Sequence, residues 1–319
     1  MPLPPAVSLI SEHILKNIEE GTQKPLFVAV QGPQGSGKSY LTGLIHSHLS
    51  NPPHSLRVAT LSIDDLYLTH DELKSLAENH PDNPLWRGRG QPGTHDVALG
   101  QHILSSLKDG QQDVELPWFD KSLFGGEGDR LPMDGTGVIL KPPIDLVIVE
   151  GWCMGFCPIP DREIETRWEG VWREEKSILG MDDSIVGTKE NIKQINHVLH
   201  RYVDLWAFFH IFVQLVPSLS DHGSRYSVVY KWRLEQEHAM KRSNGGKGMS
   251  DKAVKLFVDR YIPGYVFFGD GVVNGVSSAA SSSESTDQAA PQFIRPPWLG
   301  KSLRVVLGIE RDVVGVENF

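Results

Sequence analysis

Apolar residues recur along the chain with two periodicities, one typical of helices and one of buried strands. In residues 8–20 they fall at helical spacing, which predicts an amphipathic helix near the start. Nearly continuous apolar runs occupy residues 26–30, 58–63, 144–149, 208–216 and 303–309. Continuous rather than alternating apolar character is typical of parallel strands that are buried on both faces. We therefore predict an α/β fold with a parallel sheet flanked by helices.

Further helices are predicted between and after these strands. Residues 38–49 follow the first strand after a glycine-rich turn, and residues 230–240 follow the fourth strand. Ser250 is expected to cap a helix with an apolar face, because its hydroxyl can accept a backbone N–H in the first turn. Pro263 is expected to end that helix, because proline lacks the N–H that would continue it.

Three other stretches show neither periodicity. Residues 79–93 are rich in Pro, Gly and Arg, and residues 117–137 are rich in Gly and Asp. Long connections of this kind inside a domain are usually functional. Residues 276–292 are a Ser/Ala-rich, low-complexity stretch that we expect to be a disordered insertion. We interpret residues 1–319 as a single domain that carries this insertion.

Composition and charge restrict the partners. The chain has 319 residues, 39% of them hydrophobic, and a net charge of −9, which argues against binding nucleic acid or an anionic membrane through bulk charge. The apolar run at 206–216 is shorter than the roughly 20 residues that span a bilayer. Cys153 and Cys157 are expected to be packing residues. We predict a cytoplasmic protein, and the sequence leaves its oligomeric state open.

A glycine-rich segment between the first strand and its helix carries the most specific motif. Residues 32–39, GPQGSGKS, match G-x-x-x-x-G-K-[ST] in the strand–loop–helix context that this motif requires. The glycines allow backbone N–H groups to surround a phosphate, and the helix N-terminus favours negative charge. Lys38 would bridge the β- and γ-phosphates of ATP, and the Ser39 hydroxyl would bind Mg²⁺. The predicted ATP-binding residues are Gly32, Pro33, Gln34, Gly35, Ser36, Gly37, Lys38, Ser39 and Tyr40.

Carboxylates follow two of the other strands. Asp64 and Asp65 end the second strand and Glu150 ends the third, at the sheet edge where open α/β sheets bind ligands. Phosphate transfer to an alcohol needs a carboxylate that accepts the hydroxyl proton, and we assign this role to Asp64. Asp65 is expected to cap the next helix, and Glu150 to hold Mg²⁺ directly or through water. Lys38, Asp64 and Glu150 are thus the catalytic candidates, although Asp64 could also be a cap and Glu150 a solvated strand end.

The two long connections supply candidates for binding the phosphate acceptor. Arg87 and Arg89 are forked cations among glycines, suited to a carboxylate or phosphate, and His95 and Asp96 follow them. Arg130 ends a second stretch, residues 118–130, that could form another wall of the pocket. A small acidic substrate, an alcohol that also carries an acid group such as a hydroxy acid, would suit these groups. The alternative is a solvated surface loop.

Basic residues around a glycine turn after the fourth strand could form a helical lid. Arg233 and Lys247 are the candidates that would close over the transferred phosphate, exclude water and add positive charge. Charged residues on a helix can equally be its solvated face.

Taken together, these motifs resemble those of the fungal and plant D-glycerate 3-kinases. The segments GPQGSGKS, LSIDDLY, RGRGQPGTHD, LPWFDKSLFGGEGDR, VIVEGW and GMSDKAVKLFVDRYIPGY carry the resemblance. Phosphoribulokinase, uridine kinase and bacterial pantothenate kinase are similar more distantly. The resemblance implies a nucleoside-monophosphate-kinase-like core and transfer of phosphate from ATP to D-glycerate. It also implies that Asp64 is the base and that Glu150 is the second strand-end carboxylate, and it assigns no role to residues 161–190.

Two alternatives stay open at this point. A kinase for pantothenate or a nucleoside would have the same nucleotide site, but a nucleoside pocket needs stacking and amide groups rather than an arginine loop. A non-catalytic, regulatory ATP-binding protein would not need Asp64. The arginine loop and Asp64 favour a kinase of an acidic alcohol.

Overall fold

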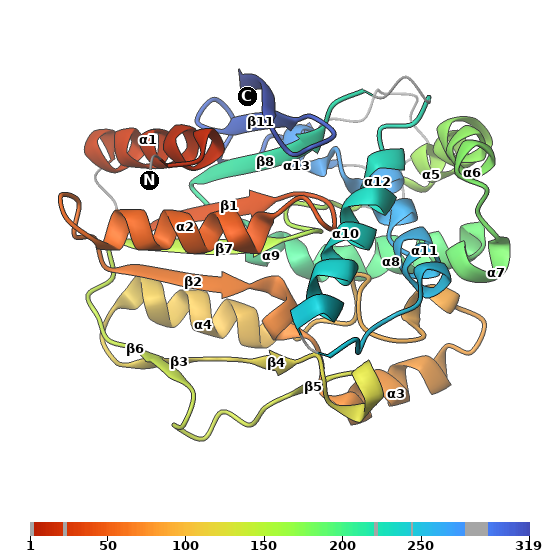
Figure 1. Cartoon of the computed structure of the whole chain (residues 1–319), viewed down its shortest axis with the longest axis horizontal. Helices are drawn as coiled ribbons and strands as arrows, with labels where there is room; N and C mark the ends of the chain where they lie inside the picture. Colours follow the sequence, from red (N-terminus) through yellow and green to blue (C-terminus); the bar gives the residue numbers. More distant parts are fainter. Residues whose placement is uncertain (1–2, 22–23, 220–222, 244, 278–292) are drawn as a thin grey trace.

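A six-stranded sheet in the order β12-β11-β8-β1-β7-β2 forms the centre of the molecule (Figure 1). The computed structural model describes residues 3–21, 24–219, 223–243, 245–277 and 293–319. Neighbouring strands pair in parallel apart from β11 and β12, which pair antiparallel. The strands are β1 (Leu26–Gln31), β2 (Val58–Ser62), β7 (Leu146–Gly151), β8 (Ile211–Pro217), β11 (Leu303–Leu307) and β12 (Val313–Asn318). The predicted α/β fold with a mainly parallel sheet is confirmed.

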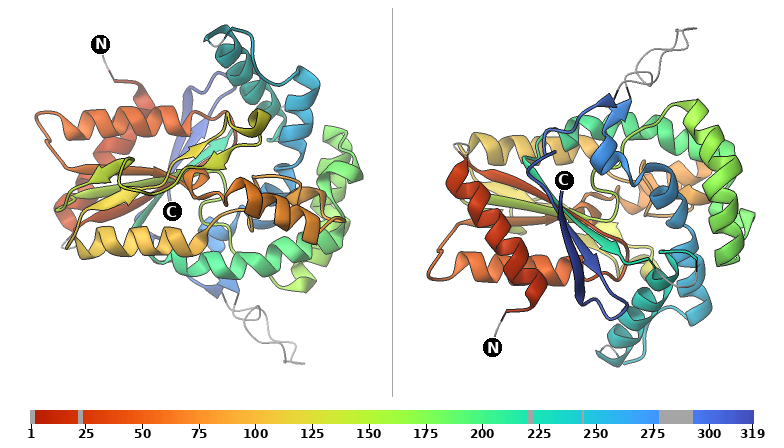
Figure 2. Two further views of the ribbon diagram at one scale, coloured as in Figure 1. Left: turned by 90° about the horizontal axis from the view of Figure 1, so that it is seen from below. Right: turned by 90° about the horizontal axis from the view of Figure 1, so that it is seen from above.

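Both faces of the sheet are covered, which explains the continuous apolar runs. In β1, Val28 and Val30 pack with Ile45 in the core on one face, while Phe27 and Ala29 belong to the core on the other face. Figure 2 shows α1 and α2 on the first face and α4 and α8 on the second. These helices are α1 (Pro5–Glu20), α2 (Lys38–Ser50), α4 (Val97–Asp109) and α8 (Lys189–Leu199).

The carboxyl ends of the parallel strands point toward a second group of helices (Figure 1). This group is α3 (His70–Asn79), α10 (Ser227–Ser243), α11 (Asp251–Asp259) and α12 (Ile262–Phe268). The other helices are α5 (Asp161–Arg167), α6 (Arg173–Leu179), α7 (Asp183–Val186), α9 (Val203–Trp206) and α13 (Gly271–Asn274). Small antiparallel pairs are β3 (Val114–Leu116) with β6 (Val138–Leu140), β4 (Phe119–Asp120) with β5 (Asp129–Arg130), and β9 (Val276–Ser277) with β10 (Phe293–Ile294).

Three details differ from the sequence predictions. Pro263 does not end a helix: α11 ends at Asp259, and Pro263 lies in the first turn of α12, where its missing N–H has no intrahelical partner to lose. Val276 and Ser277, at the start of the predicted disordered insertion, form β9, and residues 278–292 lie outside the described residues. The edge strand β12 was not predicted, because its residues are mostly exposed or half-buried rather than continuously apolar.

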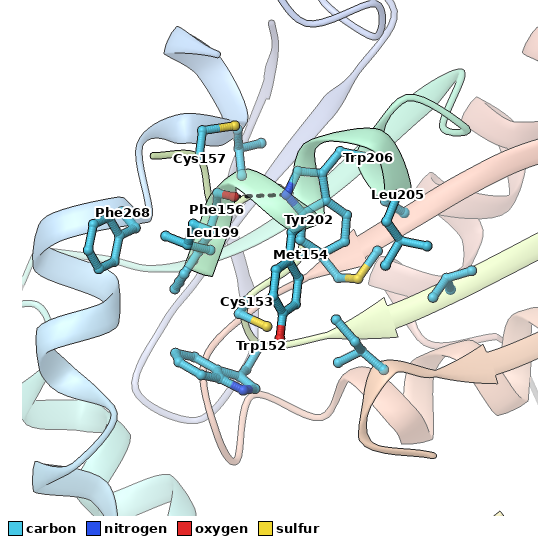
Figure 3. Packing of buried hydrophobic residues seen from close by; sticks show 14 of the residues in the cluster. Trp152, Cys153, Met154, Phe156, Cys157, Leu199, Tyr202, Leu205, Trp206 and Phe268 are labelled. Atoms are coloured by element: carbon cyan, nitrogen blue, oxygen red, sulfur yellow. Dashed lines mark hydrogen bonds between the residues drawn. The ribbon is translucent and has the colours of Figure 1, made fainter. Parts of the chain in front are cut away.

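A core of aromatic residues lies beside the carboxyl end of β7 (Figure 3). Within it the Trp206 indole N–H donates to the Phe156 carbonyl oxygen at 2.8 Å. Cys153 and Cys157 are free and buried there, which confirms their interpretation as packing residues. In the part of the chain that the structure describes, no helix combines the length and the apolar character needed to cross a bilayer.

Candidate active site

The loop between β1 and α2 adopts a conformation that requires glycine. Gly35 and Gly37 have φ of +73° and +89°, which side-chain-bearing residues rarely adopt. Gly35 also lies directly against α10, since a Cβ there would be 2.6 Å from the Trp232 carbonyl carbon. The Lys38 ammonium donates to the Pro33 carbonyl oxygen at 3.0 Å, so the lysine folds back over its own loop. Residues 32–37 therefore form a closed turn at the start of α2, and their binding of phosphate stays a prediction.

Three more of the predicted nucleotide-binding residues lie in this turn or in the first turn of α2. The Gln34 N–H donates to the Tyr265 hydroxyl of α12 at 3.2 Å. The Ser36 hydroxyl is buried and has no hydrogen-bond partner among the described residues, which leaves it available to a phosphate oxygen. Tyr40 is exposed on the first turn of α2.

Ser39 and Glu150 form a pair suited to Mg²⁺. The Ser39 hydroxyl donates to Glu150 Oε1 at 2.7 Å, joining the first turn of α2 to the end of β7. No cluster of three or more His, Cys, Asp or Glu side chains that could hold a metal occurs among the described residues. Mg²⁺ in nucleotide sites takes only one or two protein oxygens and completes its shell with water and phosphates. The hydroxyl and carboxylate present here fit that ion.

Asp64 lies in the 3-10 helix η1 (Ile63–Leu66), directly after β2, and forms an ion pair that the sequence did not suggest. The Lys121 ammonium, which follows β4, donates to Asp64 Oδ2 at 2.5 Å. Burial alone would raise the pKa of Asp64, but Lys121, assisted by His95 and Lys38, lowers it to about 2. Asp64 is thus a carboxylate that is held ionised chiefly by Lys121.

Asp65 does not cap a helix, so that prediction is wrong. Its carboxylate accepts the Phe119 N–H at 3.2 Å, and burial raises its pKa to about 6. The cap of α3 is Thr69, which forms a capping box with Glu72. Asp65 instead anchors the segment that brings Lys121 to Asp64.

His95 is buried and presents one unpaired ring nitrogen. Its imidazole stacks on Tyr67, with ring centroids 4.5 Å apart, and its Nδ1 lies 2.9 Å from the Tyr202 hydroxyl. That hydroxyl oxygen already accepts the Gly93 N–H at 2.8 Å, so its single proton is best placed toward His95 Nδ1. The Nε2 atom then carries the imidazole proton, and it has no partner among the described residues. Burial lowers the pKa of His95 to about 4, which keeps the ring a neutral donor.

The structure places Arg87 and Arg89 in different surroundings. The Arg89 guanidinium lies over the Phe119 ring at 5.5 Å and donates to the carbonyl oxygens of Gly126, at 2.8 Å, and Glu127. Arg87 instead lines a separate hollow of about 260 Å³ between η2 (Pro84–Trp86), α7 and α11. Arg89 is therefore the arginine that belongs to the wall containing Lys121.

Asp96 and Arg130, both predicted to bind the acceptor, pair with each other. Asp96 caps α4 by accepting the Leu99 N–H at 3.0 Å, and its other oxygen lies 3.0 Å from Arg130 Nη1. Arg130 also donates to the Tyr67 carbonyl oxygen at 3.3 Å. In this structure the pair holds the wall of the site together.

The predicted lid residues lie on α10 and in the turn that follows it. Arg233 pairs with the buried Glu237 carboxylate at 2.8 Å and lies over the Phe257 ring of α11. Glu237 also accepts the Met249 N–H at 2.7 Å, so this group joins α10 to α11. Lys247 is exposed in the intervening turn. The closing movement of a lid stays a prediction.

Comparison with known proteins places the chain among kinases, although no family model matches it. It is 36% identical to the probable ATP-dependent kinase TDA10 of Saccharomyces cerevisiae over 283 residues, 85% of this chain and 87% of that protein. The structure of D-glycerate 3-kinase from Cryptococcus neoformans aligns with a TM-score of 0.81 and 37% identity, covering 99% of this chain and 100% of that one. The chain belongs to the D-glycerate 3-kinase family of P-loop kinases. The chloroplastic D-glycerate 3-kinase of Arabidopsis thaliana is 31% identical over 76% of this chain and 47% of that protein.

One residue at the nucleotide side of this D-glycerate 3-kinase family member was missed by sequence reasoning. Arg311, in the β11–β12 turn, donates to the Gly35 carbonyl oxygen at 2.7 Å and to that of Trp232 at 3.1 Å. It also lies 2.8 Å from the Glu235 carboxylate. This arginine joins the C-terminal hairpin to the phosphate-binding loop and α10, and no local pattern could have revealed it.

Proposed function

We propose that this protein is an ATP-dependent, Mg²⁺-dependent kinase that phosphorylates D-glycerate to 3-phosphoglycerate, with the whole chain acting as one cytoplasmic kinase domain. The observation that carries the proposal is the set of groups at one sheet edge: Lys38 after β1, Glu150 on β7 and Asp64 after β2. Burial lowers the pKa of Lys38, and the negative charges of Glu150 and Asp64 act against that shift, so the three side chains share one electrostatic environment. Family membership supports the same activity.

The chain's own residues would perform the transfer as follows. The acceptor hydroxyl donates to Asp64, which takes its proton as the oxygen attacks the γ-phosphorus. The bond between that phosphorus and the bridging oxygen breaks, and ADP leaves with the electron pair. Lys38 and the backbone N–H groups of the loop bind the phosphate charge throughout. A Mg²⁺ ion held by Ser39 and Glu150 would neutralise phosphate charge.

The acceptor side supplies donors suited to a carboxylate. Arg89 and Lys121 are cations on one wall, and the buried His95 Nε2–H is a neutral donor. A short hydroxy acid has one carboxylate and few other groups to recognise, which matches this small set. Asp96 and Arg130 contribute by holding the wall in place.

The test is ADP production with D-glycerate, pantothenate, uridine and ribulose 5-phosphate as separate acceptors. We expect D-glycerate to stimulate turnover by about 10² over the ATP-only rate, within the range that a positioned base contributes, with 3-phosphoglycerate as the product. Stimulation by another acceptor alone would reassign the substrate. Stimulation by none would favour a regulatory ATP-binding protein.

Arginine variants test how the acceptor is bound. Arg89→Ala should raise the KM for D-glycerate about tenfold with a smaller effect on kcat, because it removes a binding group from the wall. Arg87→Ala, at the separate hollow, should change KM by less. Equal effects of the two substitutions would mean that both arginines reach the acceptor.

A further inference from the structure

Lys121 forms an ion pair with Asp64, the carboxylate that the proposed reaction needs as its base. Its ammonium lies 2.5 Å from Asp64 Oδ2, and among the described residues no other side chain hydrogen-bonds to the Asp64 carboxylate. The two partners are anchored differently: the Lys121 side chain is 53% exposed, whereas that of Asp64 is 28% exposed. Asp64 is fixed by the short helix η1, and its N–H donates to the Ser62 hydroxyl. The lysine is the partner that can move.

The segment after Lys121 allows such movement. Gly125, Gly126 and Gly128 have positive φ, and Gly125 and Gly126 have no atom within 4 Å of the position a Cβ would take. A chain with several open glycines loses little packing when it shifts. Lys121 therefore lies on an exposed, glycine-rich connection between β4 and β5.

As long as the ion pair lasts, Asp64 is a weak base. The pKa of about 2 is far below the pH at which a kinase works, and the strength of general base catalysis falls with the pKa of the base. The other charged or titratable groups that interact with Asp64 are Lys38, Asp65, Tyr67, His95, Cys153 and Tyr261. If Lys121 moved away from Asp64, the contact that lowers the pKa of Asp64 most would be lost.

Arg89 is a second cation near Lys121, and together they could bind the carboxylate of an acceptor. Arg89 opposes the positive charge of Lys121, and its Nη1 is held by the carbonyl oxygens of Gly126 and Glu127. Arg89 also interacts electrostatically with the hydroxyl groups of Tyr67 and Tyr261. Two cations that repel each other beside a pair of hydroxyl groups form a ready site for a carboxylate.

We propose that, when an acidic acceptor binds, the Lys121 ammonium leaves the Asp64 carboxylate and pairs with the carboxylate of the acceptor. Asp64 then has no cation paired with it and can act as the catalytic base. This rests on the proposed function, and it makes Lys121 the residue that selects acidic alcohols. An uncharged alcohol leaves Lys121 on Asp64 and reacts slowly even when it is bound. Discrimination therefore lies in kcat as well as in KM.

Matched acid and neutral acceptors test this directly. D-glycerate is compared with glycerol, and pantothenate with pantothenol, in the wild type, Lys121→Gln, Lys121→Arg and the control Lys74→Gln on the exposed side of α3. We expect Lys121→Gln to lower kcat/KM for the acid acceptor by about 10² and to raise kcat for the neutral acceptor, because Asp64 then has no cation paired with it. Lys121→Arg should keep most of the preference, and Lys74→Gln all of it.

The pH profile supplies an independent measurement. With glycerol, the acidic limb of the wild-type kcat profile should lie near the low pKa of paired Asp64, and in Lys121→Gln it should move up toward about 4, the ordinary aspartate value. A purely structural role of Lys121 would lower all rates together without moving this limb.

The outcomes separate the two proposals. An unchanged acid-to-neutral ratio in Lys121→Gln overturns the inference, even if D-glycerate is the substrate. If D-glycerate is inert but pantothenate is preferred over pantothenol until Lys121 is changed, the inference stands and the D-glycerate assignment fails. If Lys121→Gln does not fold, the same comparison is made with Lys121→Met, and an unchanged acid-to-neutral ratio in that variant overturns the inference. Wild-type protein that phosphorylates none of the four compounds overturns both.

Discussion

At Asp64, burial and charge act on one carboxylate in opposite directions. Replacement by asparagine keeps the shape and an oxygen that can accept from Lys121, but it removes the ability to take a proton. We expect Asp64→Asn to lower kcat by about 10² or more and to leave the Kd for ATP within about twofold, because the base does not hold the nucleotide. Single-turnover kinetics and nucleotide titration measure the two quantities.

The control for Asp64→Asn is the same exchange at Asp71, whose side chain is fully solvated on α3. Asp71→Asn should leave both quantities unchanged. An undiminished kcat in Asp64→Asn would remove this residue from the mechanism.

His95 gives the protein a pH-dependent stability. Its folded pKa of about 4 lies below the ordinary 6.5, so between these values the unfolded chain binds a proton that the folded protein does not. Stability is therefore lost as the pH falls from about 6.5 to 4, by about 3 kcal/mol for this group. Asp65, whose pKa is raised to about 6, acts in the opposite direction over part of the same range.

The His95 contribution is isolated by comparing wild type with His95→Gln in denaturant unfolding at pH 7 and pH 4.5. Glutamine keeps a polar side chain of similar length but does not titrate. We expect the variant to lose less stability than wild type between the two pH values. An equal loss would show that His95 is not the group responsible.

At the residue scale, the sequence predicted best where a role depends on local order. The loop at residues 32–39 and the strand-end position of Glu150 were identified because motif and strand lie next to each other. Asp65 was misassigned because helix capping was the nearest local explanation, whereas its partner is the Phe119 N–H. Lys121 and Arg311 act on residues 57 and 276 positions away, which no local pattern reveals.

At the element scale, the approach of α10 to the phosphate-binding loop depends on Gly35. A Cβ there would lie 2.6 Å from backbone of α10, and φ is +73°. Gly35→Ala must push α10 away or distort the loop, so we expect ATP affinity to fall at least about tenfold, a cost of about 1.4 kcal/mol. Isothermal titration measures this.

Gly43 supplies the matched control for this substitution. It lies within α2 and has no atom within 4 Å of a Cβ position. Gly43→Ala should leave ATP binding unchanged and stabilise the protein by up to about 1 kcal/mol, since alanine favours helix more than glycine. Equal losses of ATP affinity in the two variants would contradict the packing explanation.

The more fully a strand is buried, the more easily its sequence predicted it. Each strand buried on both faces was visible as an apolar run, because both faces need apolar side chains. The edge strand β12 has no such run, since only its pairing with β11 specifies it. Pro263 was misread because a proline in the first turn of a helix and one that ends a helix look alike in sequence.

At the scale of the whole molecule, the nucleotide side of the site draws on distant parts of the chain. Gly35 belongs to the first loop, Tyr265 to α12 and Arg311 to the last hairpin, and all three meet around one turn. A ligand bound there contacts a structure that exists only in the folded protein. Binding must therefore stabilise the fold as a whole.

Thermal unfolding with and without nucleotide measures this coupling. At a free ATP concentration 100 times Kd, with Mg²⁺, the free energy of unfolding should rise by about 2.7 kcal/mol, which corresponds to a shift in Tm of about 5 °C. Chelation of Mg²⁺ should reduce the shift, because Ser39 and Glu150 then have no metal to share with the phosphates. Lys38→Met should abolish most of it, whereas Lys16→Met, at an exposed site on α1, should not. A full shift in Lys38→Met would place the nucleotide elsewhere, because a phosphate bound at this turn cannot lose its half-buried cation without losing affinity.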